Sequence, residues 1–255
     1  MPTRSLTAKQ HELYQRNILL AGVGTAGQEK LLNSSVLLVG AGGLGSPVAF
    51  YLTAAGVGRI GLIDADTVGL SNLQRQILHT KADLGRPKVV SAAEKLKALN
   101  PDLVVELHQK RFDAGTANDL VPNYDIVIDC TDNFAARYAI NEACIKAGKP
   151  FVYGGVLAWA GQMFTILPGR GPCFRCIFRD DPPPNAPSTS ELGILGAVPG
   201  VIGTLQASEA VRYLLGTGEL LVGRMLIYDA LSAAFSEVAL ERDPDCPSCG
   251  GIDFK

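Results

Sequence analysis

The sequence has no excess of either charge. Its 23 lysines and arginines are balanced by 25 aspartates and glutamates, so the formal net charge of the 255 residues is −2. A chain this close to neutral has no electrostatic reason to bind nucleic acid or an acidic membrane surface. We therefore expect neither nucleic acid nor a membrane among its partners.

The sequence also lacks an uninterrupted apolar run of the kind that crosses a membrane or directs secretion. Residues 36–58 carry no charge, but six glycines and Pro47 interrupt them, which favours a tight turn between a buried strand and a buried helix. Near the amino terminus, charged residues break up any apolar signal core: Arg4, Lys9, Glu12 and Arg16. We expect a cytoplasmic protein, a setting in which disulfides are rare.

Four of the six cysteines form two closely spaced pairs, Cys173-x-x-Cys176 and Cys246-x-x-Cys249. Each pair lies in turn-forming sequence, and two such pairs can supply four thiolates to a tetrahedral structural zinc ion. Disulfides are the alternative interpretation, which the expected compartment disfavours. Because 69 residues separate the two pairs, the metal would attach the carboxyl-terminal tail to the body of a larger domain.

Strand-like and helix-like stretches alternate between residues 35 and 155. Continuous apolar runs, typical of parallel strands covered on both faces, lie at 35–39, 58–64, 125–130 and 150–153. A helix is predicted from Pro87 to Leu99, where Asn100-Pro101 ends it. Later strands are expected at 162–167, 224–229 and 235–240, a helix at 202–215, and an exposed proline-rich loop at 180–191.

These elements predict an α/β fold class: a Rossmann-like, mostly parallel sheet with flanking helices, extended by additional strands and a structural zinc lobe. The length suits one large domain. We expect a single domain over residues 1–255, with an amino-terminal helical segment at 1–30 and a nucleotide-binding part at 31–155. Residues 156–255 form the zinc-bearing part.

A glycine-rich turn, Gly40-Ala41-Gly42-Gly43-Leu44-Gly45, follows the first predicted strand and opens a helix. Gly40, Gly42 and Gly43 allow a phosphate to approach backbone N–H groups at the start of a helix. Asp64 ends the next strand, where a carboxylate can accept hydrogen bonds from ribose hydroxyls. Nucleotide binding is favoured over a turn that only packs helix against strand. The pattern alone leaves NAD, FAD and ATP open.

The residues beyond this aspartate favour phosphoryl chemistry over hydride transfer. Ser71 and Gln74 form a capping-box pattern, so a short helix is predicted there, with Arg75 just beyond the ribose site. Lys88 occupies the first turn of the next helix, where a nearby anion would explain a cation. Asp132, at the carboxyl end of a strand, is either a helix N-cap or a magnesium ligand. Two cations and a carboxylate around a triphosphate suit phosphoryl transfer.

Over essentially its whole length, the chain resembles the MoeB/ThiF/HesA family of ubiquitin-activating-enzyme-like adenylyltransferases. The glycine turn and the two cysteine pairs carry this resemblance, together with residues 14–20 (YQRNILL), 64–66 (DAD), 71–76 (SNLQRQ), 85–88 (GRPK), 129–133 (DCTDN) and 200–207 (GVIGTLQA). The resemblance implies that MgATP is used to adenylate the carboxyl-terminal glycine of a small ubiquitin-like sulfur-carrier protein ending in Gly-Gly, with release of pyrophosphate.

The resemblance also implies roles for single residues. Arg75 and Lys88 contact the phosphates of ATP, Asp132 binds Mg²⁺ and Asp64 holds the ribose. Arg16 matches an arginine that reaches ATP from the other subunit of a homodimer. Further residues expected at the ATP site are Gly40, Gly42, Gly43, Ser71, Asn72, Gln74 and Asn133. Residues 156–255 would also carry the face on which the carrier docks.

One position departs from much of the family, in which a loop cysteine after the first cysteine pair can bond covalently to the carrier or its sulfur. Here Thr189 takes its place, and a hydroxyl is a poor substitute for a thiol nucleophile. Cys130 and Cys144 are predicted to be core residues. We therefore expect the reaction to stop at the acyl-adenylate and a separate sulfur donor to carry out thiolation.

Val198-Pro199-Gly200 and the missing loop cysteine favour the MoeB group, which serves molybdenum cofactor biosynthesis. Thiamin synthesis and a dedicated thiolation pathway stay open. So do two other functions, a non-catalytic scaffold that docks a ubiquitin-like protein and a dinucleotide oxidoreductase. The latter leaves the two cations, the carboxylate and the cysteine pairs without a purpose. Residues predicted to be solvated or packed, without a ligand role, are His11, His79, His108 and Trp159.

Overall fold

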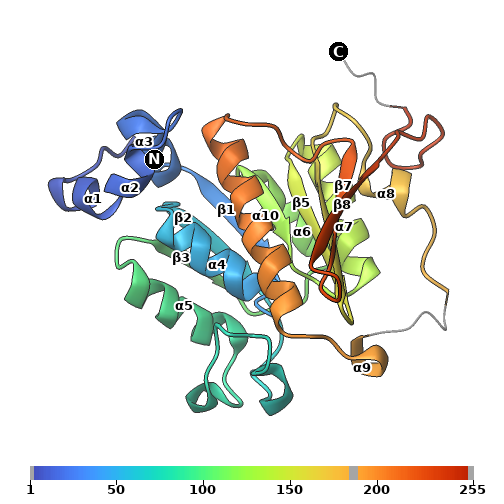
Figure 1. Ribbon diagram of the computed structural model, residues 1–255, viewed down its shortest axis with the longest axis horizontal. Helices are drawn as coiled ribbons and strands as arrows, with labels where there is room; N and C mark the ends of the chain where they lie inside the picture. The colour runs from blue at the N-terminus through green and yellow to red at the C-terminus, as the bar shows by residue number, and fades with distance from the viewer. Residues whose placement is uncertain (1–2, 184–188, 252–255) are drawn as a thin grey trace.

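The computed structural model describes residues 3–183 and 189–251. Within these residues the strands are β1 (Ser35–Val39), β2 (Arg59–Ile63), β3 (Val104–His108), β4 (Ile126–Asp129), β5 (Phe151–Leu157), β6 (Ala160–Ile166), β7 (Arg224–Asp229) and β8 (Ala234–Ala239). They form one sheet in the order β3-β2-β1-β4-β5-β6-β7-β8. Figure 1 shows that helices cover both faces of this sheet.

The α-helices of the described residues are α1 (Ala8–Leu13), α2 (Gln15–Ile18), α3 (Gly24–Leu32), α4 (Gly45–Ala54), α5 (Lys88–Leu99), α6 (Ala114–Leu120), α7 (Phe134–Ala147), α8 (Phe174–Ile177), α9 (Thr189–Leu192) and α10 (Ala197–Leu215). Short 3₁₀ turns are η1 (Leu70–Asn72), η2 (Lys81–Asp83) and η3 (Val121–Asn123). α4, α5 and α10 pack on one face of the sheet and α6 and α7 on the other (Figure 1). In the described part of the chain, no helix combines the length and the apolar character needed to cross a membrane.

The first part of the sheet is parallel and the last part antiparallel. β3, β2, β1, β4 and β5 run parallel to one another, whereas β6, β7 and β8 each pair antiparallel with the strand before them. Every residue of β1 is buried, as expected for a strand that is covered on both faces. The predicted Rossmann-like, mostly parallel sheet with additional strands is therefore confirmed.

Strand β1 separates two apolar cores, because successive side chains of a strand point to opposite faces. Val36 and Leu38 belong to the core beneath α4, α5 and α10. Leu37 and Val39 belong to the core on the α6–α7 side. Because all four side chains are almost completely buried, the loops at the end of β1 start from a rigid base.

The strand order reverses at β1, which has β2 on one side and β4 on the other. Val39 at the end of β1 pairs with Asp129 at the end of β4, so the loops that follow these two strands begin side by side. Open parallel sheets bind ligands at such a switch point, outside the carboxyl ends of the strands. The glycine turn of residues 40–45 and the segment 130–133 both lie there.

Several predicted boundaries differ from the structure. α10 begins at Ala197 rather than at 202, because Pro199 falls in the first turn, where backbone N–H groups have no partner within the helix. α5 begins at Lys88, with Pro87 as its N-cap residue. The prediction that all of 180–191 lacks regular structure is wrong at its end. α9 begins at Thr189, two residues after the last proline.

β3 was not predicted at all. It lies at the edge of the sheet beside β2, and its residues are half-buried or exposed rather than uniformly buried. The sequence Val104-Val105-Glu106-Leu107-His108 therefore does not show the continuous apolar run by which the central strands were recognised. An edge strand needs only one paired side and tolerates polar residues.

Candidate nucleotide site and four-cysteine cluster

The glycine turn is fixed by close contacts within itself and to the neighbouring loop at Cys130. Gly40 has a φ of +98°, and a Cβ there would lie 2.7 Å from the carbonyl oxygen of Cys130. At Gly45 an added Cβ would lie 2.1 Å from the carbonyl oxygen of Gly40. Both positions require glycine, the first for its left-handed backbone as well. At Gly42, by contrast, the nearest atom would be 3.5 Å away, so the protein itself leaves space there.

A cavity of about 2010 Å³ opens at this end of the sheet. Most residues predicted for the nucleotide site line it: Gly40, Gly42, Gly43, Asp64, Ser71, Gln74, Arg75, Lys88, Asp132 and Asn133. The residues come from five separate stretches of the chain, which the fold brings to one place. Arg16 and Asn72 are not among the described residues that line the cavity.

The Asp64 carboxylate accepts backbone hydrogen bonds from two segments, the glycine turn and the residues that follow β2. One carboxylate oxygen accepts a hydrogen bond from the Ala41 N–H at 2.9 Å, and the other accepts one from the Asp66 N–H at 2.8 Å. A carboxylate has further lone pairs, so Asp64 can hold the glycine turn and still accept bonds from a ribose. Asp64 therefore lies beside the glycine turn and contacts it directly.

Lys88 is a buried cation with a carboxylate partner. Its Nζ donates to Asp66 at 2.8 Å and lies 3.9 Å from Asp64. The lysine side chain is 7% exposed and that of Asp66 70% exposed. The sequence predicted an anion near this first-turn lysine, and the carboxylate of Asp66 supplies one. Both residues line the cavity.

The segment that carries Arg75 folds differently from the prediction. The capping box of Ser71 with Gln74 is wrong, since Leu70–Asn72 form a 3₁₀ turn and the Asn72 side-chain oxygen accepts the Gly69 N–H at 3.0 Å. This bond holds the Asn72 carboxamide within its own turn. Arg75 is half-buried and donates one hydrogen bond, to the carbonyl of Ser71 at 3.1 Å, which leaves most of its donors for a ligand.

Asp132 is not the helix cap that it resembled. Asn133 caps α7, because its side-chain oxygen accepts the Ala136 N–H at 2.9 Å. Asp132 is exposed and lines the cavity. Of the two interpretations of Asp132 that the sequence left open, the structure therefore removes the N-cap. Its carboxylate stands at the site without a structural role of this kind.

A buried pair supports the loop that carries Asp132, and sequence reasoning missed it. The side chain of Asp129 is fully buried, and one of its oxygens lies 3.5 Å from Nε of Arg137. Burial raises the pKa of Asp129, against the opposing charge of Arg137. Arg137 also donates to the carbonyl of Thr131 at 2.9 Å. The spacing of Arg137, one helical turn beyond the N-cap Asn133, is the only sequence signal for this contact.

The four paired cysteines meet in one cluster, with all four sulfur atoms within 4.8 Å of one another. Sγ of Cys173 lies 3.5 Å from that of Cys246, and Sγ of Cys176 lies 3.4 Å from that of Cys249. These distances exceed the roughly 2.05 Å of a disulfide. They are close to the separation of about 3.8 Å between sulfurs that share a tetrahedral zinc ion at about 2.3 Å. The donor set therefore fits a four-coordinate metal.

The remaining cysteines and histidines are placed as follows. Cys130 and Cys144 are buried, and burial raises the pKa of each thiol, which confirms the prediction that they belong to the core. His11 is exposed and His108 half-buried, whereas His79 is 4% exposed. Trp159, predicted to pack, is 47% exposed at the turn between β5 and β6. The side chain of Thr189 lies outside the described residues.

Arg16 lies on α2 and is exposed. Figure 1 places α2 with α1 and α3 at one end of the molecule. Arg16 is not among the described residues that line the cavity. The role in a homodimer that the resemblance implied stays a prediction.

The switch-point cavity, the glycine turn and the charged residues around it define a Rossmann-like fold of the nucleotide-binding type, with a separate four-cysteine cluster that could hold a metal ion. A family model described as the ThiF family matches residues 14–248. The chain belongs to the ThiF family, which confirms the resemblance found in its motifs.

Individual relatives are similar over nearly the whole chain. The identity is 45% over 250 residues to the sulfur carrier protein adenylyltransferase of Thermus thermophilus, covering 96% of this chain and 92% of that protein. It is 45% over 254 residues to the SAMP-activating enzyme E1 of Haloferax volcanii, covering 98% and 94%. Among solved structures, E. coli MccB with ATP has a TM-score of 0.83 at 23% identity, covering 96% of this chain and 75% of that one. This last similarity concerns the fold alone.

Proposed function

We propose that this chain is an ATP-dependent adenylyltransferase that activates the carboxyl-terminal glycine of a small ubiquitin-like sulfur-carrier protein. The observation that carries the proposal is the meeting of the glycine turn, Arg75, Lys88 and Asp132 at one cavity. Relatives of nearly the same length are named for the activation of such carriers. A scaffold that only docked the carrier would need none of these charged groups.

The reaction joins two anions, which explains why cations line the site. A carboxylate oxygen of the carrier attacks the α-phosphorus of ATP, and the bond from that phosphorus to the oxygen bridging toward the β-phosphate breaks. Pyrophosphate leaves with the electron pair, and no proton needs to move. Lys88 and Arg75 offset the repulsion between carboxylate and phosphates and stabilise the charge that builds on the leaving group.

Lys88 can transfer from its carboxylate partner to a phosphate at small cost. Asp66 is 70% exposed, so water can solvate its carboxylate once the ammonium group of Lys88 turns to the nucleotide. Lys88 itself is almost buried, which strengthens its interaction with an incoming phosphate. The pair therefore keeps the cation in place without competing strongly for it.

Asp132 fits a magnesium site. Its exposed carboxylate faces the cavity and is not needed as a helix cap, and hard carboxylate oxygens are preferred magnesium ligands. A bound Mg²⁺ would neutralise part of the charge of the phosphates. The protein's part is to hold this carboxylate at a fixed place, through the cap at Asn133 and the bond from Arg137 to Thr131.

The four-cysteine cluster is proposed to hold a structural zinc ion. Four thiolates close the coordination shell and leave no position for a substrate. The pairs lie at α8 and near the carboxyl terminus, so the metal would connect two segments that are 69 residues apart. The cluster packs on the core of the α6–α7 side, which gives it a role in stability rather than in the reaction.

The partners follow from the same proposal. Gly193 lines the cavity and would have no atom within 4 Å of an added Cβ, so it leaves room for a Gly-Gly carrier tail. The protein acts as a homodimer in which Arg16 serves the neighbouring site, and it works in the cytoplasm. Because Thr189 replaces a loop cysteine, a separate sulfur donor converts the adenylate to the thiocarboxylate.

The proposal is tested by following the α-phosphate and the γ-phosphate of ATP separately. The purified protein is incubated with Mg²⁺, a carrier ending in Gly-Gly, and ATP labelled in either the α- or the γ-phosphate. The α-label is expected with the carrier and the γ-label in pyrophosphate. A carrier without its last glycine is the control and should receive no label. Tight ATP binding without label on any carrier would favour the docking scaffold instead.

A further inference from the structure

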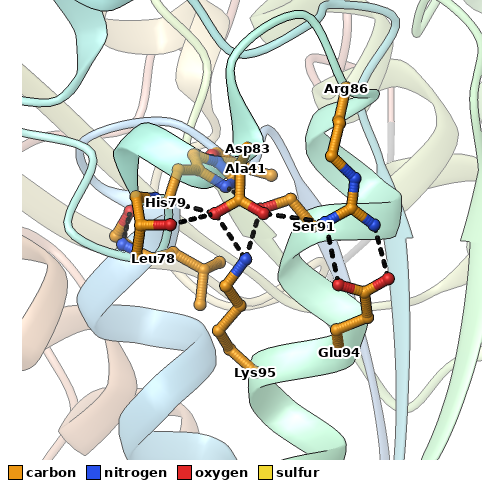
Figure 2. Close-up of polar contacts among 10 residues, drawn as sticks. Ala41, Leu78, His79, Asp83, Arg86, Ser91, Glu94 and Lys95 are labelled. Atoms are coloured by element: carbon orange, nitrogen blue, oxygen red, sulfur yellow. Dashed lines mark hydrogen bonds and ion pairs between the residues drawn. The ribbon is translucent and has the colours of Figure 1, made fainter.

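His79 bridges the glycine turn and helix α5. Its ring is buried, with Nε2 2.9 Å from the carbonyl oxygen of Ala41 and Nδ1 2.9 Å from the hydroxyl oxygen of Ser91. Figure 2 shows His79 in one group with Ala41, Ser91, Asp83 and Lys95, and the Lys95 ammonium group paired with the Asp83 carboxylate. Among the described residues His79 belongs to no group that could hold a metal ion, so its hydrogen bonds are the feature to explain.

The hydrogen bonds have one direction. A carbonyl oxygen only accepts, so Nε2 carries the proton and donates to Ala41, and Nδ1 accepts from the Ser91 hydroxyl. Lys95 donates to the same hydroxyl oxygen at 3.0 Å, and its charge is paired with the buried carboxylate of Asp83. Lys95 thus donates to Ser91, Ser91 donates to His79, and the neutral Nε2–H form of His79 donates to the glycine turn at Ala41.

The peptide unit that His79 holds also carries a phosphate donor. The carbonyl of Ala41 and the N–H of Gly42 belong to one planar trans peptide and point in opposite directions. The peptide before it is anchored as well, because the Ala41 N–H donates to Asp64 at 2.9 Å. A carbonyl turned toward the buried His79 thus turns the Gly42 N–H to the opposite side, and Gly42 lines the cavity.

His79 also connects the elements that bear the two cations. It follows Arg75 by four residues on the same segment, and its partner Ser91 follows Lys88 by three residues on α5, one turn away. We propose that His79 is a positioning residue for ATP, which fixes the glycine turn relative to α5 so that the Gly42 N–H and Lys88 meet the phosphates together. This inference rests on the proposed function.

The test compares variants that differ in the donor to Ala41. His79→Leu removes it, His79→Gln can restore an N–H donor, and Ser91→Ala leaves the donor but loosens the ring. Asn100→Leu serves as the control, because it breaks buried hydrogen bonds at the far end of α5. For each purified protein, the Kd of MgATP is measured by calorimetry and the Tm by thermal unfolding. Carrier-dependent pyrophosphate exchange gives kcat and both KM values.

His79→Leu is expected to weaken MgATP binding about tenfold or more, since a buried carbonyl loses its donor, and to raise the KM for ATP without raising that for the carrier. His79→Gln should recover most of the loss and Ser91→Ala should fall between. If His79→Leu does not fold, the other two variants carry the test, with Ser91→Ala binding ATP more weakly than Asn100→Leu at a similar Tm.

Equal ATP binding by the wild-type protein and His79→Leu would overturn the inference while leaving the proposed function intact. Equal losses of MgATP binding in His79→Leu and Asn100→Leu would also overturn it, because the effect would then be general destabilisation. Where His79→Leu does not fold, the same conclusion follows from equal losses in Ser91→Ala and Asn100→Leu. Failure of the wild-type protein to bind MgATP would instead overturn the proposed function.

Discussion

The ammonium group of Lys88 lies 2.8 Å from a carboxylate oxygen of Asp66, with the lysine buried and the aspartate mostly in solvent. This asymmetry separates the two roles of the lysine. Its position depends on the buried stem and on the start of α5, whereas its partner can be replaced by water or by a phosphate. Activity and stability should therefore respond differently when Lys88 is changed.

Lys88→Met keeps the apolar stem and removes the charge. We expect pyrophosphate exchange to fall about 100-fold or more, the loss typical of removing one preorganised group that stabilises transition-state charge. The free energy of unfolding in urea should change by only about 1 kcal/mol, because the abandoned Asp66 is exposed and the nearly buried Asp64 loses only a longer ion pair of 3.9 Å. Near-normal exchange in this variant would show that the lysine does not face the reacting phosphates.

Neighbouring residues 132 and 133 should separate function from stability. Asp132→Ala is expected to abolish Mg²⁺-dependent exchange with little change in unfolding free energy, since Asp132 does not cap α7. Asn133→Ala removes the cap and should cost about 1 kcal/mol. Exchange rates at several Mg²⁺ concentrations and urea unfolding check both. A destabilised but active Asp132→Ala protein would contradict the assignment.

The cysteine cluster should bind one metal ion per chain. Replacing the native ion with Co²⁺ is expected to give the absorption bands of tetrahedral thiolate coordination, and Cys246→Ser should weaken them. Chelation should lower the Tm, because the metal joins two distant segments. The readouts are metal analysis, visible absorption and thermal unfolding. Disulfide-linked cysteines in the intact protein, detected by mass spectrometry, would argue against a metal.

His79 should contribute to the pH dependence of stability. Burial lowers the pKa of His79 below the ordinary 6.5, and the charges of Lys88 and Lys95 act in the same direction, whereas the hydrogen bond to the Ala41 carbonyl and the charge of Asp83 oppose the shift. The unfolded chain then binds the proton more readily, so stability is full above about pH 6.5 and falls as the pH drops below it. Burial raises the pKa of the Asp83 carboxyl, but its hydrogen bonds and the charge of Lys95 outweigh burial and lower the pKa. Asp83 therefore loses its contribution to stability only in more acidic solution.

Urea unfolding of the wild-type protein and of His79→Gln between pH 8 and pH 5 isolates this contribution. The wild-type protein should lose more stability over that range, because glutamine does not titrate. Other groups with lowered pKa values, such as His108, are present in both proteins and cancel in the difference. Parallel curves would mean that His79 is not held in its neutral form.

The proposed homodimer, in which Arg16 acts across subunits, predicts complementation. Arg16→Ala and Asp132→Ala should each be inactive alone. Mixing them should restore part of the exchange, because a mixed dimer contains one site with Asp132 from one chain and Arg16 from the other. Gel filtration would show the dimer, and exchange after mixing would show the recovery. No recovery from a dimer known to exchange subunits would contradict this role of Arg16.

The sequence predicted the central strands, the glycine turn and the cysteine pairs because their signals are local. Residues 35–39 form an uninterrupted apolar run, and the spacing of Gly40, Gly42 and Gly43 is recognisable without knowledge of distant contacts. Asp64 was identified in the same way, from its place at the end of a strand. Local pattern and tertiary structure agree at these positions.

The missed features depend either on contacts between distant parts of the chain or on small shifts in the start of a local turn or helix. His79 meets Ala41, 38 residues earlier, and no local pattern indicates which backbone carbonyl a buried histidine will find. Whether Asp132 or Asn133 caps α7 depends on one residue of register, which composition does not resolve. The Asn72 bond to Gly69 replaced the predicted capping box because a 3₁₀ turn formed with its N-cap two residues earlier, at Gly69 rather than Ser71.

The most direct test of the central claim is ATP–pyrophosphate exchange with labelled pyrophosphate, measured with and without a carrier protein that ends in Gly-Gly. Adenylation predicts exchange that requires the carrier and Mg²⁺ and that disappears in Asp132→Ala. Exchange that is absent with every such carrier, although the protein binds ATP, would contradict the assignment of this site to carrier adenylation.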